Sequence, residues 1–470
     1  MGFSIISINL FALPSLDSYL WSLFTTNRVV CRVIDNTYLN YYLLMGKKII
    51  FLSFLLFSIN SWTQSSLTLT PEQILKKVFD SIGKIYPEIV QSPEKFRLKV
   101  VLTGIKRSNE QVQLETAGFR TEANEYLYPA STVKLPSLLV ALEESNRLKA
   151  INSSISSSSP LSFIKKKGCL TSSNSFKINK VSHPITLDLL GKQVLLVSDN
   201  NAYNYIFEYC GQKLLNQRIT SIGFDKARFT RKFVLNCSLE ENRISDSIVF
   251  LDANNKPIFS RPMITNTDSI FVDTTATLGQ KYIGPDKNTV DKPFDFSKQN
   301  NFNVLDLHKV VSGLFFPSSS FSHKFDITKE QRQFLIKNMG AYPYESDLNY
   351  SKTDYFPAYK KYIFYGRTAR ADISEDTLNR FRSFNTVGLS FGCVIDAAYL
   401  VDYETGKECI LTMAVYANKD ELINDAKYDY ETFAFPLFKD FGKIVMHYLN
   451  ENKSAVPHLK HTAKELGFLK

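Results

Sequence analysis

The 470-residue chain has only six cysteines, and no two of them form a C-x-x-C pair. Structural zinc sites usually take two ligands from such a pair, so a zinc site is not expected. The cysteines are expected either to be buried thiols or to form one or two disulfides. They are Cys31, Cys169, Cys210, Cys237, Cys393 and Cys409.

Long apolar runs, basic clusters and internal repeats are also missing. Charged residues make up 22% of the chain and hydrophobic residues 44%, which excludes a disordered chain and a multi-span membrane protein. The formal charge of +10 is spread along the sequence without a recognisable nucleic-acid module, so nucleic acid is not expected as a partner. The length allows a signal sequence plus one large domain or two medium ones.

A second methionine, Met45, begins a segment typical of a secretory signal peptide. Two lysines follow it, and then an apolar run, Ile49–Ile59, that is too short for a membrane span. No cysteine follows the run, so a lipoprotein anchor is not supported. We expect residues 1–44 to be an upstream extension, residues 45–63 a signal peptide, and residues 64–470 an exported domain, periplasmic or extracellular. A buried helix or an N-terminal anchor is the alternative for the apolar run.

Secondary-structure signals predict sheet-forming parts at both ends, at about residues 70–127 and 380–450, around a mostly helical part at about 128–379. A serine-rich stretch at 151–160 predicts an exposed loop. Helices are expected at residues 70–82, 186–210, 304–314, 328–339 and 433–449, and strands at 96–102, 112–117, 384–390, 393–402 and 409–416.

Ser131 and Lys134 stand three residues apart at the start of an apolar-periodic run that predicts a helix. Residues three apart share a helix face, so the hydroxyl is expected beside the amine. A partly desolvated lysine can lose its proton and activate a serine, which is otherwise a poor nucleophile. The spacing alone is not specific, because it recurs at Ser81, Ser92 and Ser162 in ordinary surface sequence.

Ser198-Asp199-Asn200 is a polar break between two apolar helical stretches. Small polar groups at such a break are expected to line a cleft. The alternative is that they only cap the neighbouring helices.

Ser-x-x-Lys at Ser131 followed by Ser-Asp-Asn at Ser198 resembles two of the three ordered signatures of the penicillin-binding and class A β-lactamase superfamily of serine hydrolases. The resemblance covers about residues 71–449. It implies an α+β fold in which an antiparallel sheet from both chain ends is flanked by helices and joined to a mostly helical domain.

The resemblance also implies roles for individual residues. Ser131 would be the nucleophile that forms an acyl-enzyme, and Lys134 would be the activating lysine. Ser198 would relay a proton towards the leaving nitrogen, and Asn200 would orient the lysine and the substrate amide. The backbone N–H groups of Ser131 and Leu389 would form the oxyanion hole.

The third signature of that family, Lys-Thr-Gly, is missing from the strand where it belongs. In that register Gly388 is present, but Thr386 stands at the lysine position and Val387 at the hydroxyl position. Those two groups help to bind a substrate carboxylate, so poorer β-lactam affinity is expected. Arg380 or Arg382 is a candidate replacement for the charge. The predicted substrate-binding residues are Asn200, Thr386, Gly388 and Leu389.

Class A enzymes also use a glutamate to activate the deacylating water, and Glu240 or Glu241 falls at a plausible distance for it. Without such a glutamate, the acyl-enzyme would be long-lived. The resulting hypothesis is an exported serine hydrolase that acts on a β-lactam or a related cell-wall amide of peptidoglycan type, without metal or cofactor. The alternatives are a catalytically impaired binding protein and an esterase or peptidase with another substrate.

Overall fold

A computed structural model of the protein describes residues 69–108, 111–319, 325–367 and 373–450. The predicted upstream extension, the predicted signal peptide and Cys31 lie outside these residues. Among the helices in the described ranges, none is long and apolar enough to cross a membrane.

The five strands of the central sheet come from both ends of the chain, as the sequence predicts. β1 (Lys99–Ser108) and β2 (Gln111–Phe119) form an antiparallel hairpin. β14 (Phe381–Ser390), β15 (Cys393–Asp402) and β16 (Lys407–Tyr416) form an antiparallel meander. β16 pairs with β1, so the strand order is β14-β15-β16-β1-β2, with β14 at one edge.

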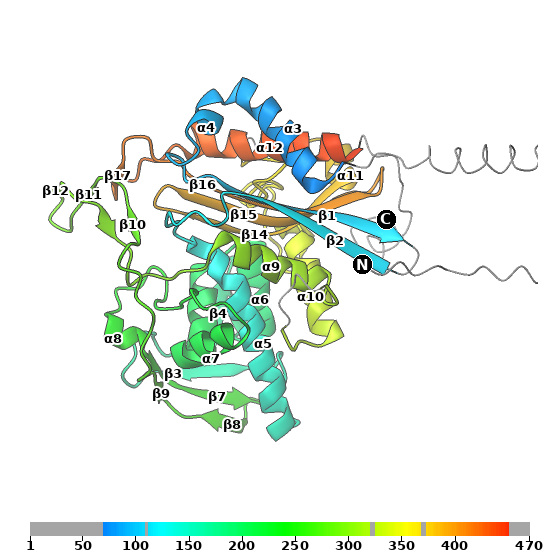
Figure 1. Cartoon of the computed structure of the whole chain (residues 1–470). Helices are drawn as coiled ribbons and strands as arrows, with labels where there is room; N and C mark the ends of the chain where they lie inside the picture. The colour runs from blue at the N-terminus through cyan, green and yellow to red at the C-terminus, as the bar shows by residue number, and fades with distance from the viewer. Residues whose placement is uncertain (1–68, 109–110, 320–324, 368–372, 451–470) are drawn as a thin grey trace, which may run out of the picture. The chain divides into compact units, whose positions relative to one another are not determined.

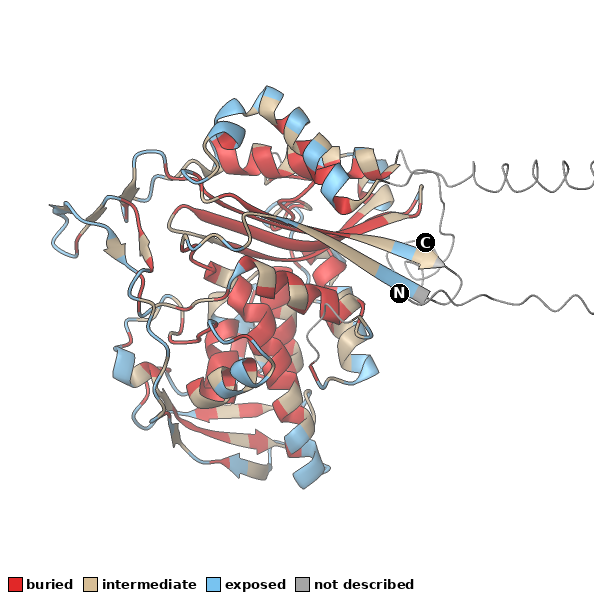
Figure 2. Cartoon of the chain, viewed as in Figure 1, coloured by how far each residue is buried: buried red, intermediate tan, exposed pale blue. Residues whose placement is uncertain are grey.

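Helices cover both faces of this sheet (Figure 1). α3 (Pro71–Ile85) and α12 (Phe435–Asn450) pack together on one face, and α9 (Val304–Phe315) and α10 (Lys329–Gly340) lie against the other. α3 starts where the sequence predicts, with Thr70 as a side-chain N-cap. The sheet is buried between these layers, whereas the outer side of α3 is exposed (Figure 2).

A buried histidine fastens α9 to the sheet. His308 lies between two strand threonines, with its Nε2 atom 2.7 Å from Thr103 Oγ1 and its Nδ1 atom 2.9 Å from Thr412 Oγ1. Burial lowers the pKa of His308 to about 3, so the ring is neutral and can donate one hydrogen bond and accept another. The contact spans β1 and β16, the two strands where the N-terminal and C-terminal parts of the sheet meet.

Three long helices form the part of the molecule that carries the predicted site residues. They are α5 (Lys134–Ile151), α6 (Leu187–Leu196) and α7 (Asn200–Ser221), and each packs against the other two. The two helical stretches predicted within residues 186–210, with a polar break between them, are confirmed as α6 and the first part of α7. α5 is buried on all sides over its first turns rather than along one stripe (Figure 2).

The middle of the chain holds more strands than the sequence predicts. β3 (Leu161–Ile164), β7 (Ser247–Leu251) and β8 (Pro257–Arg261) form a three-stranded sheet. The other added strands are two to four residues long, too short for an alternating pattern to reveal. They are β4 (Ser175–Ile178), β5 (Val181–Pro184), β6 (Ile244–Ser245), β9 (Ile264–Thr265), β10 (Thr277–Leu278), β11 (Lys281–Ile283), β12 (Thr289–Val290), β13 (Phe294–Asp295) and β17 (Leu422–Ile423).

Short helical pieces complete the fold. The serine-rich stretch is a loop from residue 152 to residue 160, one residue shorter than predicted because α5 ends at Ile151, and it is anchored by the fully buried Ile155. The short helical pieces are α4 (Pro87–Gln91), α8 (Leu239–Asn242), α11 (Glu375–Arg380), the 3-10 turns Ala130–Val133 and Pro343–Glu345, and a π-helical turn at Tyr430–Ala434.

The predicted α+β fold is confirmed.

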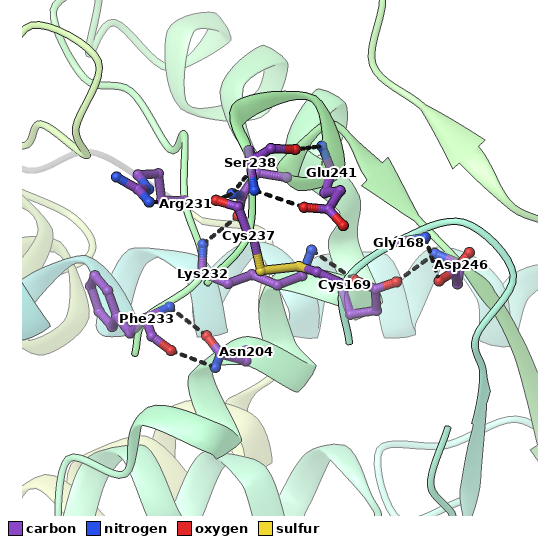
Figure 3. Close-up of a disulfide and its surroundings, with 12 residues drawn as sticks. Gly168, Cys169, Asn204, Arg231, Lys232, Phe233, Cys237, Ser238, Glu241 and Asp246 are labelled. Carbon is purple, nitrogen blue, oxygen red and sulfur yellow. Dashed lines mark hydrogen bonds and ion pairs between the residues drawn. A yellow bond between two sulfur atoms is a disulfide. The ribbon is translucent and has the colours of Figure 1, made fainter. Parts of the chain in front are cut away.

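One disulfide joins two loops of the middle region. Cys169, which follows β3, is bonded to Cys237, which precedes α8 (Figure 3). The free thiols among the described residues are Cys210, Cys393 and Cys409, all buried. One disulfide and several buried thiols fall within the alternatives that the sequence left open.

The disulfide is predicted to stabilise the fold, because it closes a chain segment with a sequence separation of 68 residues. Removing a cross-link over a loop of this size costs roughly 2–4 kcal/mol of unfolding free energy. The double variant Cys169→Ser/Cys237→Ser should therefore unfold at a lower temperature than the wild type. Reductant should lower the wild-type transition and leave the double variant unchanged. A wild-type transition that is insensitive to reductant, at the same temperature as the variant, would contradict the prediction.

Candidate active site

The chain enters α5 through a 3-10 turn, Ala130–Val133, that contains Ser131. Side chains three residues apart eclipse each other in a 3-10 turn, so Ser131 and Lys134 project to the same side. The hydroxyl of Thr132 donates to the Pro129 carbonyl at 2.7 Å and holds the turn closed. Ser131 is half-buried, and its side chain lines a pocket.

Lys134 is buried, with only 2% of its surface exposed. Its amine donates to the Ser198 carbonyl, to Ser198 Oγ at 3.2 Å and to Asn200 Oδ1 at 2.8 Å. The lysines of the three other Ser-x-x-Lys sequences are exposed, and they are Lys84, Lys95 and Lys165. Burial therefore separates this lysine from its look-alikes.

Burial also changes the protonation of Lys134. Loss of solvation lowers the pKa of Lys134 to about 7, Asp199 raises it and the charge on Lys360 lowers it further. About half of the molecules then carry a neutral amine at neutral pH, which can accept a proton.

The Ser198-Asp199-Asn200 break has a defined local structure. Asp199 caps α7 by accepting a hydrogen bond from the Ala202 amide at 2.8 Å. Ser198 has a φ of +58°, in the left-handed region that serine rarely adopts. In this conformation both the carbonyl and the hydroxyl of Ser198 accept from Lys134. The capping role and the cleft-lining role thus fall on different residues of the same break.

Two adjoining pockets meet at Ser131. The smaller, of about 160 Å³, is lined by Ser131, Ser198 and Asn200 together with residues of β14. The larger, of about 350 Å³, contains Ser131 and Asn200, the cationic Arg231 and Lys232, the polar Gln299 and Ser390, and seven apolar side chains. The apolar residues of the larger pocket are Tyr128, Ala130, Phe233, Val234, Leu235, Leu389 and Phe391.

The hydroxyl of Ser131 makes no hydrogen bond with any residue in the described ranges. The structure therefore joins Lys134 to Ser198 and Asn200, and it sets Ser131 and Ser198 in one pocket, without a direct bond between Ser131 and Lys134. Catalytic hydrogen bonds are often long in unliganded proteins and shorten when substrate binds.

β14 approaches the Ser131 turn closely at Gly388. A Cβ atom at this position would lie 2.4 Å from the Pro129 carbonyl oxygen, so a side chain would push the strand away. Leu389 borders both pockets and Val387 borders the smaller one. Thr386 is buried and borders neither, because alternate residues of a strand face opposite sides. Of the predicted substrate-binding residues, Asn200 and Leu389 border these pockets, whereas Thr386 and Gly388 border neither.

The two arginines suggested as replacements for the missing lysine are engaged elsewhere. Arg380 is paired with Asp402 at 2.8 Å and with Glu404 at 2.7 Å. Arg382 is paired with Glu345 at 2.9 Å. Neither borders a pocket that contains Ser131, so this suggestion is also wrong.

Neither candidate glutamate reaches Ser131. Glu241 accepts from the Ser238 amide in the capping box of α8, and Glu240 is exposed beside Arg243 (Figure 3 shows Glu241). Among the described residues that line the two pockets, there is no carboxylate. The described ranges also contain no group of three or more His, Cys, Asp or Glu residues that could hold a metal ion.

The loop before α8 instead brings an aromatic ring over the lysine. The Lys134 amine lies 5.5 Å from the centre of the Phe233 ring. Asn204 fixes this loop, because its amide accepts from the Phe233 N–H at 2.7 Å and donates to the Phe233 carbonyl at 2.9 Å (Figure 3). Sequence reasoning missed both residues, since an isolated phenylalanine in an irregular segment carries no signal of its own.

Sequence reasoning also missed Tyr359 and Lys360. Both border the smaller pocket together with Arg367, from a segment between α10 and α11. A Lys-Lys pair inside an aromatic-rich run was the available signal, because charges in such a run need a partner.

The buried amine predicts a specific pH dependence of stability. The Lys134 pKa is about 7 in the folded protein and 10.5 for an ordinary lysine side chain, so between these limits only the unfolded state keeps the proton. The contribution of Lys134 to the free energy of unfolding therefore rises by about 1 kcal/mol per pH unit above pH 7. Below pH 7 this contribution does not change with pH. The unfolding free energy of the wild type minus that of Lys134→Met should increase by about 2 kcal/mol from pH 7 to 9 in urea titrations.

The exposed-lysine variant Lys95→Met serves as the control, and its difference from the wild type should not vary with pH in this way. A constant difference between wild type and Lys134→Met over the same range would show that the amine is not held neutral.

Comparison with known proteins gives a family match for part of the chain. A model of the Beta-lactamase enzyme family matches residues 107–264. A search of curated protein sequences found no match. Among solved structures, the class A beta-lactamase from Bacteroides cellulosilyticus DSM 14838 is 15% identical, over 82% of this chain and 99% of that chain, with a TM-score of 0.41. The chromosome-encoded beta-lactamase of Vibrio parahaemolyticus is 14% identical, over 78% of this chain and 98% of that chain, with a TM-score of 0.41.

The matched segment contains Ser131, Lys134 and the Ser198-Asp199-Asn200 break. Residues 107–264 of the chain therefore resemble the Beta-lactamase enzyme family.

Proposed function

We propose that the protein is a serine hydrolase that forms an acyl-enzyme on Ser131 with a β-lactam or a related cell-wall amide. The observation that carries the proposal is the buried amine of Lys134, held by Ser198 and Asn200 at the pocket that Ser131 lines. Export through the predicted signal peptide fits a cell-wall substrate and is part of the same proposal.

In the proposed acylation step, Ser131 Oγ attacks the carbonyl carbon of the substrate and its proton passes to the neutral Lys134 amine. The C–N bond then breaks, and the Ser198 hydroxyl passes a proton to the leaving nitrogen while Lys134 returns one to Ser198. The hydrogen bond between Lys134 and Ser198 supports this relay. The backbone N–H groups of Ser131 and Leu389 are proposed to hold the oxyanion, since both residues border the same pocket.

We propose that deacylation is slow. The hydrolytic water needs a general base, and the residues that line the two pockets include no carboxylate in the described part of the chain. The group that faces Lys134 from the loop before α8 is the ring of Phe233, which cannot take a proton. A positioned general base typically contributes 10²–10⁴-fold, so its loss leaves an acyl-enzyme that persists.

An esterase or peptidase is the second candidate function. It is favoured by the larger pocket, whose aromatic and aliphatic lining suits an apolar acyl group without requiring a β-lactam ring. A binding protein without turnover is the limiting case in which Ser131 is not acylated.

Covalent labelling tests these alternatives. Intact mass measured after incubation with a fluorescent penicillin and with a fluorophosphonate should show one adduct of each on the wild type and none on Ser131→Ala. Ser162→Ala, from a look-alike sequence with an exposed lysine, should label like the wild type. Labelling by fluorophosphonate alone would support the esterase or peptidase, and no adduct in a folded protein would support the binding protein.

The lifetime of the adduct tests the proposal of slow deacylation. After excess penicillin is removed, the acyl-enzyme mass should decay at least about 100-fold more slowly than it formed at saturating probe, because no pocket carboxylate activates water. A time course of intact mass measures both rates. Rapid turnover of penicillin without an accumulating adduct would show that another group activates the water efficiently.

A further inference from the structure

Lys360 is a buried lysine with spare hydrogen-bonding capacity beside the proposed nucleophile. It is 4% exposed, and its amine donates to the Leu195 carbonyl. With the described residues it makes no other hydrogen bond and no ion pair. An ammonium group has three N–H donors, so two are left for a ligand. Lys360 borders the smaller pocket together with Ser131, Ser198 and Asn200.

The backbone around Lys360 is fixed to the central sheet. Asn385 on β14 donates to the Lys360 carbonyl at 2.7 Å and to Asp396 on β15 at 2.8 Å. Asp396 in turn accepts from the amides of Tyr362 and Ile363, both at 2.9 Å. The Lys360 backbone is therefore held by Asn385, which is the strand neighbour of Thr386, the position where the family has its lysine.

The neighbouring Lys361 shows what a purely structural lysine looks like in this segment. Its amine donates to the carbonyl of Met339, to the carbonyl of Ser383 at 2.8 Å and to Asn385 Oδ1 at 2.9 Å. All three of its donors are used inside the protein, and Lys361 borders neither pocket. The two adjacent lysines thus differ in the number of donors that the protein itself satisfies.

The pocket around Lys360 is positive. Burial lowers the pKa of Lys360 to about 8, and the charge of Asp396 raises it, so most of the amine is protonated at neutral pH. Arg367 borders the same pocket and adds a second positive charge. A buried charge with unfilled donors is costly unless an opposite charge reaches it, and no carboxylate lines this pocket in the described residues.

We propose that Lys360 binds a carboxylate of the acyl donor and takes the place of the lysine that β14 lacks. The natural substrate is then an anionic acyl donor whose carboxylate lies against Lys360 while its reactive carbonyl faces Ser131. Arg367 supplements the charge from the pocket rim. This inference rests on the proposed function of Ser131, and the tests are chosen to separate the two.

The first test compares two acylating probes that differ only in charge, benzylpenicillin and its methyl ester. A charge-assisted contact predicts that the wild type reacts about 10- to 100-fold faster with the free acid. In Lys360→Met this ratio of acylation rate constants should fall to about one, whereas Lys360→Arg should keep most of it. The control Lys361→Met removes an adjacent buried amine and should keep the full ratio, even if it melts at a lower temperature.

The second test does not depend on β-lactam chemistry. Hydrolysis of 4-nitrophenyl hydrogen succinate, which carries a carboxylate, is compared with that of the neutral 4-nitrophenyl butyrate. The wild type should prefer the succinate ester, and Lys360→Met should lose that preference. If penicillin fails to label Ser131 but this preference is present and depends on Lys360, the β-lactam proposal falls and the anion site stands.

The ratios are internal to each protein, so partial loss of folded material does not affect them. Equal reactivity of the wild type with the charged and neutral member of each pair would overturn the anion site. A ratio that survives in Lys360→Met would overturn the assignment of Lys360. Ser131→Ala should lose both fluorophosphonate labelling and all hydrolysis. That loss identifies the nucleophile, whereas the ratio measured in the wild type identifies the anion site.

Discussion

The site depends on one costly arrangement, the burial of the Lys134 amine beneath Ser131. Removing an ammonium group from water is unfavourable, and the protein compensates with acceptors from Ser198 and Asn200 rather than with a carboxylate in direct contact. This choice matters chemically, because a paired carboxylate would hold the proton on the lysine. Neutral acceptors leave the amine with a pKa of about 7, close to the value that a general base needs.

The fold supplies this arrangement by bringing distant segments to one point. The turn before α5 holds Ser131, the break between α6 and α7 holds Ser198 and Asn200, and the edge strand β14 closes the pocket. The close approach at Gly388 requires glycine, since any side chain would strike the Pro129 carbonyl. A sheet assembled from both chain ends is what places β14 there, because it pairs only with β15 and leaves its outer edge for the turn.

Much of this could be predicted from sequence, where local patterns are strong. The capping sequence at Thr70, the β-rich C-terminal stretches and the polar break at Ser198 lead to the right elements. Short strands of the middle region could not be predicted, because their pairing is decided by tertiary contacts. The proposed replacement of the missing cation could not be predicted either, because Lys360 lies in a different segment and is joined to β14 only through Asn385, the neighbour of Thr386.

The departures from the family pattern are related. A pocket without a carboxylate loses a means of activating water, and for the same reason no carboxylate in this pocket competes with an anion for Lys360 and Arg367. Both features are consistent with acylation of Ser131 by an anionic acyl donor, followed by slow release of the acyl group. The larger pocket adds apolar side chains, among them Phe233 and Leu235, that are available for the acyl side chain.

The most direct test of this account is the pH dependence of the rate at which an acylating probe labels Ser131. For the wild type, the rate should rise about tenfold per pH unit at low pH and level off above about pH 7, as Lys134 loses its proton. Lys134→Met should be slow at all pH values, and Lys95→Met should follow the wild type. A wild-type rate that does not change between pH 5.5 and 8.5, or that Lys134→Met reproduces, would contradict the role of the buried amine.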